Sequence, residues 1–377
     1  MNVHTLTIVL ILTVMAALPA CMEESVVRIG FSGQLTGPSA DMGTAARNGA
    51  ILAVETINEA GGINGKKLEL IVADDGNSVS SAIKADEKLI AQGACAIIGH
   101  LTSSITVGTI KHFGNKILYI SPTTSTPILS GIKDSFFRII PTNTNMATIQ
   151  AQHASSVLDI QQMTILYDID NAEYSETYAE AFKSQYERDG KKVHETFVFS
   201  SKDRNSWLPF TDRLKASNAT GILMIAASKD AASFIQYLSQ HGLDITVLVT
   251  HWSSPNEIIR RAGKAADGLV ALSTHNPSDY TPQATRFKRR YKNRFGHSPI
   301  FSSYFSYEAV MLLVEAIKRN NGNTDNLETI IPNISSIEGI STRLSLDPYG
   351  DAIRNKQFII TVDNGTIHSE PFSGGKL

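Results

Sequence analysis

The stretch that decides the fold spans residues 26–73 and reads VVRIGFSGQLTGPSADMGTAARNGAILAVETINEAGGINGKKLELIVA. The β-branched run Val27–Phe31 predicts a strand, and Leu68–Ala73 predicts a second one. Between them, residues 44–60 carry apolar side chains at three- and four-residue spacing, which predicts a helix. The side chains with this spacing are Ala50, Ile51, Val54 and Ile57. A strand, a helix and a second strand in this order form the unit of a parallel sheet covered by helices.

The same alternation of strands and helices continues to about residue 274 and predicts an α/β fold with doubly wound parallel sheets. Further strands are expected at Ala96–Ile98, Leu118–Ile120, Met163–Tyr167, Lys192–Phe197, Gly221–Ile225, Thr246–Val249 and Leu269–Ala271. The alternation of strands and helices is interrupted at residues 138–143, where a strand-like run meets a proline, and it resumes after them. This interruption indicates a crossover into a second lobe. Two long helices are expected at 282–295 and 304–319, and residues 343–377 read as strands and turns.

Length and composition favour two globular domains. The chain has 377 residues, of which 42% are hydrophobic and 19% charged, and a domain commonly holds ~150 residues. The formal net charge is −2, so no basic excess points to nucleic acid. The mean hydropathy of −0.06 is typical of a globular protein outside the membrane.

The N-terminus predicts export. Residues 5–20 are apolar or small and uncharged, and they end at Leu-Pro-Ala-Cys. The run is shorter than the roughly 20 apolar residues that span a bilayer, so we expect residues 1–20 to be a signal peptide. Leu-Pro-Ala-Cys resembles the bacterial lipoprotein box, which implies a lipid anchor at Cys21 and a linker over 21–25. The second cysteine, Cys95, is expected to be a buried free thiol.

Several segments, in the right order, resemble the branched-chain amino-acid-binding protein family of ABC transporters. These segments are Gly33–Pro38, Gly49-Ala50, Ile57–Gly65, Asp74-Asp75, Ile98–Ser104 and Ile120–Pro127. The resemblance runs from about Val26 to the C-terminus. It implies a type I periplasmic binding fold, with two lobes joined by three crossovers and a ligand in the cleft between them. Residues 26–142 with 275–345 would form the first lobe, and 143–274 with 346–377 the second.

The general rule for open α/β sheets selects the loops after the strands that end at Ile98 and Ile120, because ligands bind beyond the carboxyl ends of strands. Hydroxyls and backbone N–H groups at a helix start suit a carboxylate. In the resemblance, Ser103 and Ser125, with Ser104 beside them, correspond to carboxylate-binding hydroxyls, and Thr123 to a carbonyl that takes the ligand's ammonium. Further ligand-binding positions are expected at Met42, Tyr174, Ser228, His251 and Trp252.

One departure from the family bears on the ligand. Members typically present an acidic residue after the strand at Thr246–Val249, whereas this chain reads Thr-His-Trp-Ser-Ser over 250–254. An unpaired ammonium in a closed cleft is costly to desolvate. Either Glu173 or Asp170 substitutes for the acid, or the ligand carries no ammonium. His251 and Trp252 would then suit an aromatic or simple organic acid.

No enzyme, cofactor or metal site is predicted. Ser81–Lys84 and Ser130–Lys133 both spell S-x-x-K, but the companion motifs of penicillin-recognising enzymes are absent. Asp168 and Asp170 lack the glycine and glutamate of a calcium loop, and Asp74-Asp75 is expected to cap the next helix. The expected function is import of a small carboxylate or amino acid with an ABC permease as partner. The alternative is a sensor that reports the ligand to a signalling partner.

Overall fold

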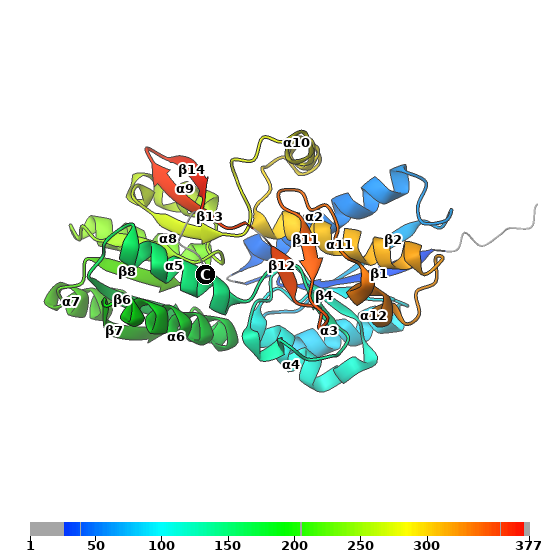
Figure 1. Cartoon of the computed structure of the whole chain (residues 1–377), viewed down its shortest axis with the longest axis horizontal. Helices are drawn as coiled ribbons and strands as arrows, with labels where there is room; N and C mark the ends of the chain where they lie inside the picture. The colour runs from blue at the N-terminus through cyan, green and yellow to red at the C-terminus, as the bar shows by residue number, and fades with distance from the viewer. Residues whose placement is uncertain (1–25, 38, 204–205, 355, 373–377) are drawn as a thin grey trace, which may run out of the picture.

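The computed structural model describes residues 26–37, 39–203, 206–354 and 356–372, and the expected signal peptide and lipid anchor at Cys21 lie outside these ranges. The described chain forms two α/β lobes side by side along the long axis of the molecule, with one helix above their junction (Figure 1). Across those ranges, every helix is too short or too polar to cross a bilayer.

The first lobe is built on a five-stranded parallel sheet in the order β2-β1-β3-β4-β5. Its strands are β1 Val27–Gly33, β2 Leu68–Asp74, β3 Ile97–Ile98, β4 Tyr119–Ser121 and β5 Phe136–Arg138. Its helices are α2 Ala40–Glu59, α3 Val79–Ala91, α4 Ser103–Phe113, α10 Pro282–Phe295, α11 Phe301–Arg319 and α12 Leu327–Ile330. Because α2 packs along α11, segments about 260 residues apart in the sequence share one core.

The second lobe is built on a seven-stranded sheet in the order β14-β13-β10-β9-β8-β6-β7. Its parallel strands are β6 Gln162–Asp168, β7 Lys192–Phe199, β8 Gly221–Ile225, β9 Thr246–Val249 and β10 Val270–Ser273. Its helices are α5 Asn143–Ser156, α6 Ala172–Arg188, α7 Leu208–Ala216, α8 Ser228–Gln240 and α9 Pro255–Ala262.

The edge of the second sheet is antiparallel, which the expectation of parallel sheets did not include. Strands β13 Phe358–Asp363 and β14 Thr366–Pro371 form a hairpin that pairs with β10. Asn364 and Gly365 connect them with φ values of 48° and 69°. Two consecutive positive φ values are the requirement of the tight type I′ turn, which joins neighbouring antiparallel strands.

The chain passes between the lobes three times, after β5, after β10 and after β12. A short hairpin of β11 Leu344–Leu346 and β12 Ala352–Arg354 precedes the third passage. The buried guanidinium of Arg354 pairs with Glu308 of α11 and donates to the carbonyl of Ile139 at 2.8 Å. These contacts tie the hairpin to the first lobe, so we propose that the last boundary follows β12 rather than residue 345.

Cys95 is half-buried rather than buried, because it lies just before β3 begins. Its thiol is free, and burial raises its pKa to about 11. At neutral pH the group is therefore a protonated thiol that packs as a small hydrophobe.

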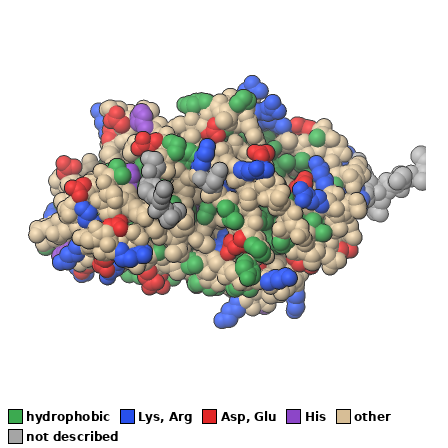
Figure 2. All heavy atoms as spheres, in the orientation of Figure 1, with side chains coloured by type: hydrophobic (Ala, Val, Ile, Leu, Met, Phe, Trp, Pro, Cys, Tyr) green, Lys and Arg blue, Asp and Glu red, His purple; other side chains and the backbone are tan. Residues whose placement is uncertain are grey.

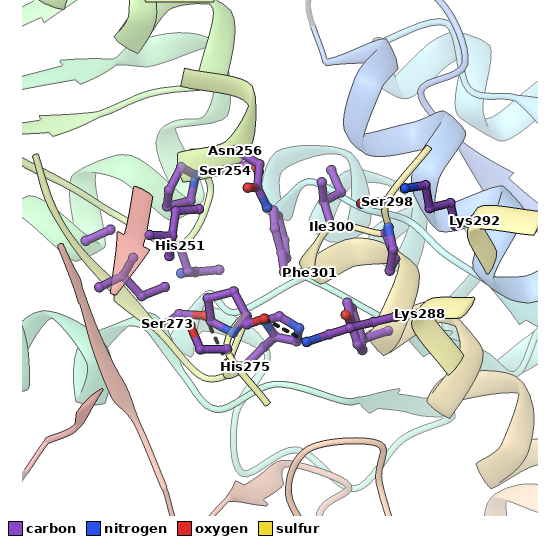
Figure 3. Close-up of a pocket in the computed structure, with 18 of the residues that line it drawn as sticks. His251, Ser254, Asn256, Ser273, His275, Lys288, Lys292, Ser298, Ile300 and Phe301 are labelled. Carbon is purple, nitrogen blue, oxygen red and sulfur yellow. Dashed lines mark hydrogen bonds between the residues drawn. The ribbon is translucent and has the colours of Figure 1, made fainter. Parts of the chain in front are cut away.

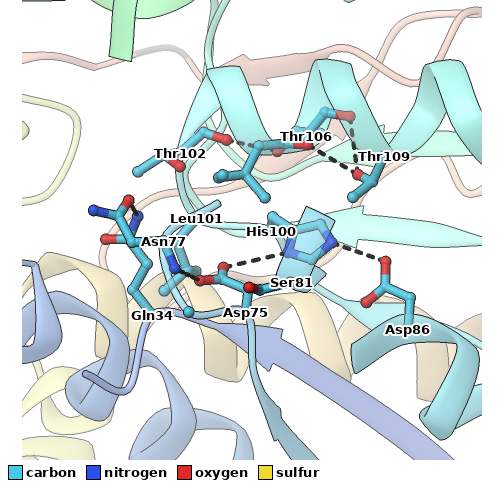
Figure 4. Close-up of polar contacts among 12 residues, drawn as sticks. Gln34, Asp75, Asn77, Ser81, Asp86, His100, Leu101, Thr102, Thr106 and Thr109 are labelled. Atoms are coloured by element: carbon cyan, nitrogen blue, oxygen red, sulfur yellow. Dashed lines mark hydrogen bonds and ion pairs between the residues drawn. The ribbon is translucent and has the colours of Figure 1, made fainter. Parts of the chain in front are cut away.

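A buried histidine joins the strands of the first lobe to the loops that follow them. His100 stands between two buried carboxylates, with Nε2 at 2.9 Å from Asp86 and Nδ1 at 3.4 Å from Asp75 (Figure 4). The hydroxyl of Tyr119 also donates to Asp86 at 2.7 Å. Burial by itself would lower the pKa of His100, but the charges of Asp86 and Asp75 outweigh it and raise that pKa to about 9. The imidazole is therefore a cation at neutral pH.

This arrangement replaces the capping role expected for Asp74-Asp75. The helix α3 is capped by Ser78, whose side chain accepts from the N–H of Ser81. Asp75 instead turns inward to His100. The interaction of Asp75 with His100, 25 residues further along the chain, cannot be predicted from the residues around Asp75. The expectation that Asp74-Asp75 caps the next helix was therefore wrong.

The pH dependence of folding tests the charged state of His100. An unfolded histidine titrates near pH 6.5, and the folded pKa is about 9. The stabilisation is therefore complete below pH 6.5 and is lost as the pH rises through 9. We expect the free energy of unfolding to fall by ~1–3 kcal/mol over this window. Urea unfolding at several pH values should show this slope in the native protein, a flat profile in His100→Gln, and an unchanged slope in the control His112→Gln, which alters an exposed histidine. An equal slope in all three proteins contradicts the assignment.

The Arg354–Glu308 pair gives a second test, because removing one partner leaves a buried charge alone. Arg354→Met should lower the free energy of unfolding by ~3–5 kcal/mol. The matched control is Arg319→Met, which breaks the exposed pair with Glu315 on the same helix and should cost less than ~1 kcal/mol. Chemical denaturation measures both. Losses of similar size would refute a structural role for the buried pair.

Candidate functional site

A small cavity lies where the two lobes meet, at the carboxyl ends of strands from both sheets. Its free volume is about 10 Å³. It is lined by Met42, Leu101, Ser103, Thr123, Asn171, Tyr174, His251, Trp252 and Phe301. Six of these were expected from the sequence as ligand-binding positions: Met42, Ser103, Thr123, Tyr174, His251 and Trp252. The lobes are closed over the cavity in this structure, so a ligand needs the cleft to open before it can enter.

The first lobe supplies hydroxyls and a helix start. Ser103 is the first residue of α4 and is 2% exposed. Thr123 lies in the loop after β4, and its hydroxyl donates to the carbonyl of Leu101 at 2.6 Å. The carbonyl of His100 accepts from Ser121 and Thr124 at 2.5 and 3.2 Å. The loops after β3 and β4 are therefore held together, and the buried imidazole of His100 fixes their position.

The second lobe supplies aromatic rings without charge. Tyr174 lies in the first turn of α6, and its ring meets those of His251 and Trp252 edge-on at 5.5 and 5.6 Å. The Tyr174 hydroxyl lies 3.3 Å from Nδ1 of His251. Burial lowers the pKa of His251 to about 4, so its imidazole is neutral at physiological pH. Nε1 of Trp252 is buried and has no partner among the described residues, so it is available to donate to a ligand.

Three expected residues do not line this cavity. Ser104 is half-buried and bonds across the cleft, with its N–H donating to Oδ1 of Asn171 at 3.1 Å and its hydroxyl to Glu173. Ser125 is fully buried, and its hydroxyl has no partner within the described ranges. Ser228 begins α8 and accepts from the N–H of Ser254 at 2.9 Å. Ser228 therefore orders the loop that carries His251 and Trp252.

Sequence reasoning missed three lining residues, and local signals existed for two. Asn171 lies three residues before Tyr174, and its side-chain amide oxygen accepts from the N–H of Ser104 in the first lobe. Phe301 begins α11, which the sequence predicted to start at Tyr304, so the error in the boundary hid it. Leu101 belongs to the loop that carries Ser103, but an apolar residue there gave no sign of a ligand site.

Neither acid expected as a substitute lines the cavity. Asp170 points to the loop after β7, where it accepts from Ser200 and from the N–H of Lys202, each at 2.9 Å. Glu173 is half-buried and accepts from the hydroxyl of Ser104. The described lining carries no carboxylate at all. In the same ranges, no three His, Cys, Asp or Glu side chains gather as a metal site. Ser130 of the S-x-x-K motif accepts from Arg138.

Comparison with known proteins gives a consistent result. Residues 26–363 match the periplasmic binding protein family. A Leu/Ile/Val-binding protein homolog from Brucella suis is 25% identical over 302 residues, which cover 79% of each chain. A branched-chain amino acid transporter substrate-binding protein of Streptococcus pneumoniae, solved with isoleucine, has a TM-score of 0.84 at 21% identity and covers 92% of this chain and 99% of its own. A solute-binding protein from R. palustris, solved with benzoate, has a TM-score of 0.84 at 16% identity, with 92% and 96% covered.

These relatives are solute-binding proteins of transporters and not enzymes. The fold shared with them is the type I periplasmic binding fold, with two lobes and a cleft between them. The match to the family extends over almost all of the described chain. This chain therefore belongs to the periplasmic binding protein family and is a solute-binding protein.

Proposed function

We propose that the chain is an exported lipoprotein, anchored through Cys21, that captures a small carboxylate in the cleft and delivers it to an ABC permease. The cleft carries this proposal, because its two walls combine hydroxyls at the start of α4 with neutral aromatic rings. The family and the names of its members support the role in transport. An open form exchanges with a closed form, and a ligand that contacts both lobes favours closure.

The ligand's carboxylate binds at the N-terminus of α4. There Thr102 offers no side-chain cap, and the N–H of Ser104 is directed toward the second lobe. In the closed structure an amide oxygen, Oδ1 of Asn171, accepts from that N–H. The oxygen acceptor at this point supports the proposal that an oxygen of the ligand binds here, and a carboxylate gains further from the positive end of the helix dipole. Ser103 adds a hydroxyl from the cavity lining. Ser125 lies outside the lining of the closed cavity, but its buried hydroxyl has no partner among the described residues and can turn to the carboxylate of a bound ligand.

The ligand carries no ammonium group, in contrast to an amino acid. Among the described residues, the cavity lining holds no carboxylate to pair with an ammonium, and His251 is neutral. Desolvating an unpaired ammonium in the closed cleft is unfavourable. Tyr174, Trp252 and Phe301 instead form an apolar box suited to an aromatic or branched organic acid. The benzoate complex of the R. palustris protein is a precedent for such a ligand on this fold.

A thermal-shift screen decides the ligand class, because a ligand that binds only the native state raises the melting temperature. We expect aromatic and branched-chain carboxylates to raise it, and the matching amino acids to have little effect. Leucine and its deaminated analogue 4-methylpentanoate form the most direct pair, because they differ in the ammonium group. A larger rise in melting temperature with leucine would show that another group takes the place of the missing acidic residue. No rise with any compound would reject the cleft as a carboxylate site.

Substitution of the hydroxyls tests the carboxylate position. Ser103→Ala and Ser125→Ala should each weaken affinity for the carboxylate found in the screen by about ten- to a hundredfold, because each removes a hydrogen bond to a charged group. Isothermal titration calorimetry measures the dissociation constants. Ser184→Ala, which changes an exposed serine of α6, should leave affinity unchanged. If both cleft variants bind like the native protein, the site is assigned wrongly.

A further inference from the structure

A larger hollow adjoins the cleft, and the expected ligand-binding residues do not account for it. We call it the α10 groove. It lies between α10 and the β13–β14 edge of the second sheet and has a volume of about 580 Å³. Its walls include Lys288 and Lys292 of α10, His275 of the second crossover, and Ile300, Tyr304 and Ile360 (Figure 3). Pockets of ~300–1,000 Å³ hold small ligands. His251 and Phe301 line both the groove and the cleft cavity, so these two side chains form the partition between them.

The charge of the groove is one-sided. Three cations line it, Lys288, Arg289 and Lys292, and the described lining contains no Asp or Glu. Lys288 is half-buried, and its ammonium donates to the carbonyls of Pro277 at 2.8 Å and Asp279 at 2.6 Å. These acceptors are neutral, and the ammonium also lies 5.3 Å from the centroid of the Tyr280 ring, so among the described residues it makes no ion pair that an anionic ligand would have to displace. The Asp279 carboxylate is nearby but accepts from the N–H of Thr281 at 2.8 Å.

The exposed surface of α10 adds to the positive electrostatic field at the groove. Arg289 and Lys292 of α10 are exposed, and Lys and Arg side chains gather over α10 at the top of the molecule (Figure 2). Arg290 and Arg294 differ from them, because they pair with Glu59 and Glu55 of α2. The cations toward the groove therefore attract an anion from solution.

The groove wall contains the buried imidazole of His275, in which one ring nitrogen has no hydrogen-bond partner among the described residues. His275 is 6% exposed, its ring lies 4.0 Å from that of Tyr304, and its Nε2 has no partner among the described residues. Burial, with the charge of Lys288, lowers its pKa to about 3, so the ring is neutral. Leaving a buried polar atom unpaired is unfavourable. With the imidazole proton on Nε2, a carboxylate oxygen between Lys288 and His275 would accept from both groups at once.

The rest of the groove is apolar. Ile300, Tyr304, Ile360 and Ile367 line it beside the polar end. A site with cations and a neutral imidazole at one end and isoleucine side chains at the other suits an anion with an apolar body. We propose that the α10 groove is a second binding site, separate from the cleft, for a small carboxylate with an aliphatic body.

Calorimetric titration with hexanoate tests the proposal on the purified protein. We expect saturable binding that weakens with added salt, whereas hexylammonium, which has the same body and the opposite charge, should not bind. This comparison uses the native protein and does not depend on the folding of a variant. Equal binding of the two probes, or no binding of hexanoate, overturns the proposal.

Variants then separate the groove from the cleft. Lys288→Met should weaken hexanoate binding about tenfold, because it removes a charge-assisted contact, and Lys292→Met, at an exposed position, should weaken it less. Arg286→Met is the control, because it removes a cation from the same helix outside the groove lining, and it should leave affinity unchanged. Because the cleft is itself proposed to bind organic acids, Ser103→Ala should weaken only hexanoate binding in the cleft and leave the binding that is sensitive to Lys288→Met unchanged. A loss with Ser103→Ala and none with Lys288→Met would place hexanoate in the cleft and refute the second site.

Discussion

The ion pairing around His100 is the constraint on which the first half of the cleft depends. A protonated imidazole between Asp75 and Asp86 brings the ends of β2 and β3 and the middle of α3 to one point, without access to water. The carbonyl of the same residue holds the loop after β4. The loops that carry the cleft hydroxyls are thus held in place by buried interactions. Such preorganisation reduces the entropy lost when a ligand binds.

The second half of the cleft follows a different principle. Its rings pack on one another rather than on charged groups, and Tyr174, His251 and Trp252 make edge-on contacts. The polar groups of Tyr174 and His251 pair with each other, so this wall is neutral as well as apolar. Selectivity would then come from the shape of the ligand's body, while the first lobe recognises its charge.

The sequence predicted the parts of this structure that local patterns encode. Strands Gly221–Ile225 and Thr246–Val249 begin and end where expected, because buried runs of β-branched residues are bounded by turns. Six cavity-lining residues followed from the family resemblance and the rule on strand ends. The rest depends on contacts between distant segments. Neither the pairing of Asp75 with His100 nor the cross-lobe amide of Asn171 has a local signature, and Ser228 faces a loop rather than the cavity for the same reason.

The contacts of Asn171 and Glu173 with Ser104 have a consequence for how the two lobes separate. They join the lobes through the protein's own side chains. Both contacts must break before the lobes can part, so opening costs these hydrogen bonds in addition to the contacts that a bound ligand makes. The rate at which a ligand leaves therefore depends on this pair of contacts as well as on the ligand's own affinity.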